Sequence, residues 1–189
     1  LGACYLERDH PLILMLRNSE AYCLAVLVGE DMAARKCSAL VADVISCPNL
    51  DPQLALAIRN NSAMPWKSTG KWAKAARVYP ELLADMAPQC EAEDMTVLTV
   101  RDNLAEVLSA DRQYGEAIRL YARNLQALLR VADRGDWRVL RLRNEIARNT
   151  WMGGDREAGE GLWTVLADDC RRYLGDRDEF TARIRTILL

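Results

Sequence analysis

The chain has 189 residues, and its hydrophobic content of 50% is enough to fill the interior of one domain or of a short array of repeats. Its 25 Lys and Arg residues are balanced by 27 Asp and Glu residues, so we expect no binding of nucleic acid, which needs basic residues in excess. Six cysteines without a CxxC pair, one histidine (His10) and no apolar run of ~20 residues argue against a zinc site, a disulfide framework and a membrane span. We therefore expect no metal, no cofactor and a cytoplasmic location.

Residues of one kind recur along the chain at a spacing of 42 residues. The clearest column consists of arginines: Arg17, Arg59, Arg101, Arg143 and Arg185. Two apolar or small columns keep the same register: Leu16, Ile58, Val100, Leu142 and Ile184, and then Ala21, Ala63, Ala105 and Ala147. Such a period is typical of solenoids, in which each unit buries its apolar face against its neighbours.

Within each unit the apolar residues follow three- and four-residue steps, which predicts two helices per unit. We interpret residues 1–8 as the end of a preceding second helix and 177–189 as a partial unit, so that the chain is one array cut from a longer protein. Four units are expected at about 9–50, 51–92, 93–134 and 135–176. The first helices are predicted at about 11–28, 53–69, 95–110, 137–152 and 178–189, and the second helices at about 30–47, 71–88, 113–132 and 155–174.

Polar residues, small residues and prolines set the predicted helix ends. Aspartates stand at the expected N-caps of the first helices: Asp9, Asp51, Asp94, Asp136 and Asp178. Turns within the units are predicted at 29–31, 68–70, 110–112 and 153–155. Small residues mark the places where the two helices close together: Ala33, Ala75, Ala117 and Gly159. Pro65 and Pro80 fall inside predicted helices of the second unit and are expected to kink or break them.

Three stretches carry a family resemblance: ERDHPLILMLRNSEA, LTVRDNLAEVLSADRQYGEAIRLY and LRLRNEIARNTWMGGDREAGEGLW. They resemble tetratricopeptide repeats (TPRs) of the kinesin-light-chain type, and the resemblance covers essentially the whole chain. It implies an all-α, right-handed solenoid of helical hairpins whose first helices line a concave groove that holds peptides. Bacterial chains of this kind look like sensor or scaffold regions of larger signalling proteins.

The resemblance places a set of candidate peptide-binding residues along this groove. They are Asn18, Tyr22, Asn60, Met64, Asp102, Glu106, Arg141, Asn144 and Arg148. The predicted groove is apolar at Tyr22 and Met64, then acidic, then basic, which favours a peptide of mixed charge. The asparagines are the preferred contacts, because an amide can donate to and accept from a peptide backbone. Trp66 and Trp151 are expected to reach the groove, and the alternative is a solvated polar face without a ligand.

For the arginine column we favour a structural role over ligand binding. An arginine at one position of every unit can pair with the aspartates that recur in the second helices, Asp43, Asp85 and Asp169. Such a ladder would join the two helices of each hairpin.

The function indicated is that of a scaffold that binds a peptide or protein segment in its groove. We expect no catalytic residue, since His10 lies in a helix-start segment and no known nucleophile or phosphate-binding motif is present. Two alternatives remain open: a ligand-responsive segment of an NTPase-coupled or transcriptional regulator, and a structural spacer that self-associates through exposed end helices.

Overall fold

The computed structural model describes residues 10–189 except 28–29, 48–49, 89 and 92. The predicted helix end at 1–8, the Asp9 cap and the Gly29 turn lie outside the described residues. Within the described part the chain is helical and has no strand. It divides into two compact units, one ending at Asp85 and the other beginning at Met86. We describe each unit by itself.

The first unit holds two helical hairpins. One is formed by α1 (Pro11–Leu27) and α2 (Glu30–Ile45). The second consists of four shorter helices, α3 (Pro52–Asn61), α4 (Met64–Ser68), α5 (Trp72–Ala76) and α6 (Val78–Met86), the last of which reaches the boundary between the units. Both α3 and α4 pack against α1 and α2.

The prolines explain why the second hairpin is divided. The helix predicted at 53–69 is interrupted at Ser62 and Ala63, and Pro65 lies in the first turn of α4, where no backbone donor is required. The helix predicted at 71–88 is interrupted at Arg77, and Pro80 lies near the start of α6. The predicted breaks are therefore confirmed in both helices.

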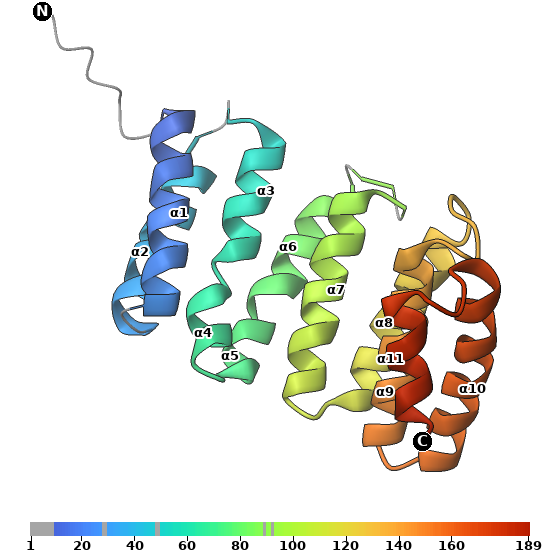
Figure 1. The fold of residues 1–189 in the computed structure, drawn as a ribbon. Helices are drawn as coiled ribbons and strands as arrows, with labels where there is room; N and C mark the ends of the chain where they lie inside the picture. Colours follow the sequence, from blue (N-terminus) through green and yellow to red (C-terminus); the bar gives the residue numbers. More distant parts are fainter. Residues whose placement is uncertain (1–9, 28–29, 48–49, 89, 92) are drawn as a thin grey trace, which may run out of the picture. The chain divides into compact units, whose positions relative to one another are not determined.

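The second unit contains longer, uninterrupted helices. They are α7 (Met95–Ala110), α8 (Tyr114–Leu128), α9 (Trp137–Met152), α10 (Arg156–Tyr173) and α11 (Glu179–Ile187). Each packs against the next along the chain (Figure 1). The second unit is thus two full hairpins followed by one further helix.

The four predicted N-caps that lie within the described residues are all present. A carboxylate oxygen of the capping aspartate accepts a hydrogen bond from a backbone N–H in the first turn of α3, α7, α9 and α11. The capping residues are Asp51, Asp94, Asp136 and Asp178. These caps satisfy donors that the helix itself leaves unpaired.

Small residues are buried where the two helices of each hairpin approach. The alanines of both columns are at most 2% exposed. In the last full hairpin the position belongs to Gly159, which lies against the backbone of Trp151 in α9. Trp151 was expected to reach the groove, but it packs against Gly159 and Trp163, the ring centres of the two tryptophans being 6.5 Å apart.

Candidate functional site

The arginine column forms ion pairs inside the hairpins. A first-helix arginine that is 20% to 22% exposed pairs with a second-helix aspartate that is 29% to 59% exposed. The pairs are Arg17 Nη2 to Asp43 Oδ2 at 2.6 Å, Arg59 Nη2 to Asp85 Oδ2 at 2.6 Å and Arg143 Nη1 to Asp169 Oδ2 at 2.7 Å. The three predicted pairs are confirmed, and each joins the two helices of its hairpin. Arg185 differs, because its contact with Asp176 is 3.6 Å long and both side chains are largely exposed.

In the third hairpin the first-helix arginine also contacts the second helix, but its partner there is an asparagine. Here Arg101 Nη1 donates to Asn124 Oδ1 at 2.8 Å, and Asn124 Nδ2 donates to the backbone oxygen of Leu98 at 2.8 Å. Asn124 stands where the other second helices have buried leucines, and Ala127 stands where they have the pairing aspartate. The arginine's partner has therefore moved by three residues, about one helical turn. Burial lowers the pKa of Arg101, with a smaller contribution from the charge of Arg123.

Of the groove residues predicted in the second unit, Asp102 of α7 and Arg141 of α9 contact each other, and Glu106 is exposed on α7. Arg141 Nη2 lies 3.0 Å from Asp102 Oδ2, and Arg148 Nη2 lies 2.6 Å from Glu145 Oε2 on its own helix. Asp102 and Arg141, which were predicted to belong to an acidic and a later basic segment, form one ion pair between α7 and α9. Glu145 was not predicted as a groove residue.

The asparagine column makes contacts within the protein. Asn144 Oδ1 accepts a hydrogen bond from Nε1 of Trp163 in α10 at 2.9 Å, so this acceptor also joins the two helices of its hairpin. In the first unit the amide of Asn61 lies 3.5 Å from Asn18 Oδ1, and the amide of Asn60 lies 3.5 Å from Asn61 Oδ1. The asparagines thus contact neighbouring side chains of the protein.

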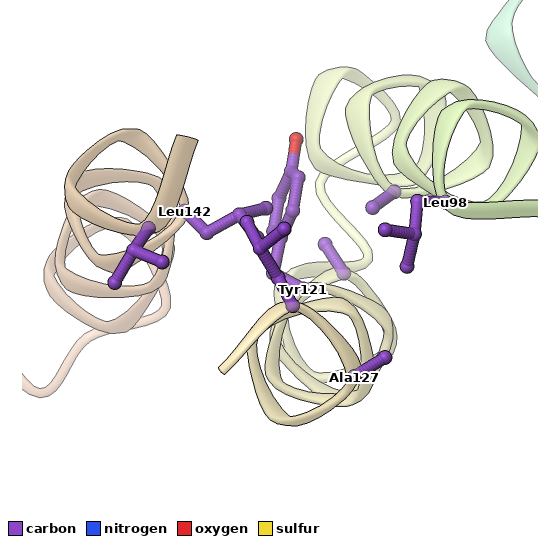
Figure 2. Close-up of a cluster of buried hydrophobic side chains, with 8 residues drawn as sticks. Leu98, Tyr121, Ala127 and Leu142 are labelled. Atoms are coloured by element: carbon purple, nitrogen blue, oxygen red, sulfur yellow. The ribbon is translucent and has the colours of Figure 1, made fainter. Parts of the chain in front are cut away.

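Tyr121 of α8 is buried in the hydrophobic core of the second unit, and it was not predicted as a site residue. Figure 2 shows its ring rising from α8 between Leu98 of α7 and Leu142 of α9, with the hydroxyl at the end away from α8. Burial, reinforced by the carboxylates of Glu145 and Asp102, raises the pKa of Tyr121. The phenol therefore stays protonated near neutral pH and remains able to donate a hydrogen bond.

A repeated signal could have identified Tyr121. Counted at the same spacing of 42 residues, its column contains buried side chains in all four hairpins: Cys37, Tyr79, Tyr121 and Trp163. A column that combines burial with polar aromatic side chains indicates a buried layer that contains hydrogen-bonding groups. This interpretation needs the helical hairpin geometry, which the apolar periodicity alone does not supply.

A hollow of about 180 Å³ lies between α7, α8 and α9. Its lining includes the exposed side chains of Met95 and Trp137, together with Asp102, Arg138 and Arg141. Arg138 is held by the carboxylate of Asp136 through contacts of 2.9 and 2.6 Å. An exposed indole and thioether next to charged groups are the parts of a recognition surface that apolar side chains of a partner can cover.

Asp102 has an unsatisfied acceptor at this hollow. Its Oδ2 pairs with Arg141, but its Oδ1 is buried and accepts no hydrogen bond from the described residues. Burial raises the pKa of Asp102 in spite of the opposing effect of Arg141, and the nearby Glu145 and Glu106 add to the rise. A buried acceptor without a donor is costly, so a ligand that supplies the donor gains affinity from it.

The remaining predicted groove residues lie in the first unit or at its helix ends. Tyr22 is exposed on α1, and Met64 is the half-buried first residue of α4. Trp66 lines a separate hollow of the first unit. Among the described residues no group of histidines, cysteines or carboxylates has the arrangement of a metal site. Nor does this part of the chain contain a helix with the length and apolar character to cross a membrane.

Comparison with known proteins gives the fold. No protein-family model matches the chain, and no curated protein matches it by sequence. Among solved structures, it is similar to the TPR-like repeats of a putative kinesin light chain from Podosopora anserina, with a TM-score of 0.78 and 18% identity over 95% of this chain and 85% of that one. It is also similar to BtubC from P. vanneervenii, with a TM-score of 0.76 and 18% identity over 94% of this chain and 71% of that one.

A further similar structure is PlcR of Bacillus thuringiensis in complex with the peptide PapR7 and DNA. The TM-score is 0.67, with 15% identity over 95% of this chain and 62% of that one. Together with the hairpins, the small-residue columns and the arginine ladder, these similarities show that the chain folds as a TPR-like helical repeat protein.

Proposed function

We propose that the second unit binds an extended segment of a partner protein at the hollow between α7, α8 and α9 that Asp102 and Trp137 line. The observation that carries the proposal is the side chain of Asp102, which lines a hollow that also exposes Trp137 and whose buried Oδ1 accepts no hydrogen bond from the described residues. A partner residue that combines an apolar body with an N–H or O–H group fits both features. The similarity to PlcR, a structure that contains a bound peptide, is consistent with this class of ligand.

The charges of the groove favour such a neutral donor. Arg141 and Arg148 are already paired with Asp102 and Glu145, so neither sign of charge is left in large excess among these residues. A partner cation would lie close to both arginines, and a partner anion would face the carboxylate of Asp102. We therefore expect a polar, uncharged side chain or a backbone N–H at Asp102.

Substitution of Asp102 by asparagine tests the proposal. Peptides selected from a random phage-displayed library on the whole chain are expected to bind D102N about tenfold more weakly in calorimetric titrations. The reason is that Arg141 would still contact the amide oxygen of the new asparagine. The NH₂ group of the asparagine would then replace Oδ1, and it cannot accept a hydrogen bond from the ligand. D168N, which changes an exposed aspartate of α10, is the matched control and should bind as the original chain does.

The stability of D102N separates lost binding from lost structure. Because the pKa of Asp102 is raised on folding, its protonated form is favoured in the folded state, and its contribution to stability is lost as the pH rises through that pKa. D102N should therefore be no less stable than the original chain at pH 7 in urea unfolding. Unchanged peptide affinity in a folded D102N would refute the groove proposal.

Self-association is a second candidate function, and one observation favours it. Leu16 on α1 is 67% exposed, whereas the residues at the same position of the later first helices are at most 3% exposed. Those residues are Ile58, Val100, Leu142 and Ile184. This apolar position is buried in all the later units. Another helical surface, such as that of a second copy of the chain, could therefore bury Leu16 as well.

We expect Leu16→Glu to weaken self-association, because it places a charge on the apolar face of α1. Sedimentation analysis over about a hundredfold range of concentration measures the effect, which should reach about tenfold in the dissociation constant. The control is Arg35→Glu, which alters a solvated position of α2. A chain that is monomeric at every concentration contradicts this second candidate and leaves the groove proposal untouched.

A further inference from the structure

The first unit contains a hollow that is larger than the hollow of the second unit described above, and the two have no lining residue in common. Its volume is about 510 Å³, and helices α2 to α6 all contribute to it. Apolar side chains from two different helices, Val41 and Ile45 of α2 and Val78 of α6, form part of the lining. The indole of Trp66 in α4 forms another part, and Ile45 is 68% exposed.

The breaks caused by the prolines border this hollow. Ser62, in the interruption between α3 and α4, and Arg77, in the interruption between α5 and α6, both line it. Pro65 itself is buried, and Trp66 follows it directly. In the second unit the first and second helices run without interruption, so this hollow lies where α2 meets the hairpin that the prolines divide.

The charged part of the lining is mainly basic. It contains the cations Arg59, Lys74 and Arg77 and one carboxylate, Glu81. Arg59 is neutralised by Asp85 at 2.6 Å, and the ammonium group of Lys74 lies 4.6 Å from the centre of the Trp66 ring. The guanidinium group of Arg77 makes no hydrogen bond or ion pair with a described residue. The lining therefore retains one positive charge in excess, next to apolar surface.

We propose that this hollow binds a short segment of a partner protein in which a carboxylate side chain lies beside an apolar one. The carboxylate pairs with Lys74 and Arg77, since an arginine fork and an ammonium group next to an aromatic face are both suited to an anion. The apolar side chain covers Ile45 and Val78, which removes exposed apolar surface from water. The site is independent of the hollow that Asp102 and Trp137 line in the second unit, because the two hollows share no residue.

Titration with defined peptides tests the inference on the whole chain. The probe is a capped peptide of alternating leucine and glutamate, and its matched control has glutamine in place of each glutamate. Two-dimensional NMR of backbone amides and tryptophan indoles locates the binding. We expect the acidic peptide to shift the signals of Trp66, Ile45 and Val78, and the glutamine peptide to bind about tenfold more weakly.

Variants identify the charged contact. Arg77→Glu should weaken the acidic peptide about tenfold, whereas Arg35→Glu, which makes the same charge change outside the hollow, should alter its affinity by less than about twofold. Equal binding of the two peptides, or an unchanged affinity in Arg77→Glu, overturns the inference. So does the same pattern of shifts with inorganic phosphate alone, which would indicate a site for small anions. Shifts confined to Asp102 and Trp137 would also overturn it, while supporting the groove.

Discussion

Replacement of Asn124 by leucine is expected to lower the free energy of unfolding by about 2 kcal/mol, although leucine is the buried residue at this position in the other three hairpins. Leucine removes the acceptor of Arg101 and leaves its guanidinium group, which is partly buried, without that partner. The loss of a hydrogen bond to a charged group outweighs the gain from one more apolar side chain. Urea unfolding followed by far-ultraviolet circular dichroism measures the effect.

The same experiment has a specific rescue. Adding Ala127→Asp to Asn124→Leu rebuilds the arrangement of the last full hairpin, where Leu166 is buried and Asp169 pairs with Arg143. We expect this double variant to regain at least about half of the lost stability. Ala127→Asn in the same background is the matched control and should restore less, because it supplies no charge for Arg101. Full stability of Asn124→Leu alone would show that the hydrogen bonds of Asn124 contribute nothing net.

Gly159→Ala is the second change with a large expected effect, a loss of about 2–3 kcal/mol in the same assay. A methyl group on Gly159 would lie 2.6 Å from Cβ of Trp151 and 2.9 Å from its Cα and N atoms. Two of these are backbone atoms of α9, so the two helices would have to move apart. The other hairpins accept alanine at this position, which shows that the requirement for glycine is local to α9 and α10.

Gly161 supplies a control on the same helix. A methyl group added there meets no atom within 4 Å, so Gly161→Ala should raise stability by about 0.5–1 kcal/mol through the better helix propensity of alanine. Opposite signs for the two substitutions would establish that packing, and not glycine's flexibility, decides the result at position 159. A neutral Gly159→Ala would mean that α9 and α10 separate at little cost.

Local features of the chain were predictable because they depend on neighbours in sequence. Helix periodicity, the capping aspartates and the prolines at 65 and 80 act through backbone groups within a few residues, and each has its predicted effect. The arginine ladder was also predictable, since Arg17, Arg59 and Arg143 each stand 26 residues before their aspartates. Because the hairpins share one geometry, residues separated by this interval come into contact in each of them.

The candidate groove was predictable only in part. Its position on the first helices followed from the repeat register and the family resemblance, and Asp102 and Arg141 do line a hollow there. The contacts that each side chain makes could not be predicted from the repeat register. Whether Asn144 faces a partner depends on Trp163 in the opposite helix, and whether Asp102 is acidic surface or half of an ion pair depends on Arg141, 39 residues away.

The sequence by itself thus determined the repeat, the helical hairpins, their caps and breaks, and the ladder that joins their helices, because these follow from local propensity and from a spacing that is the same in every unit. The tertiary structure decided which polar atoms remain available to a partner. Packing between helices made Tyr121 a buried core residue, Asn144 an internal contact and Asp102 Oδ1 an unsatisfied acceptor. Burial and pairing of this kind are properties of the assembled hairpins, and no single repeat contains them.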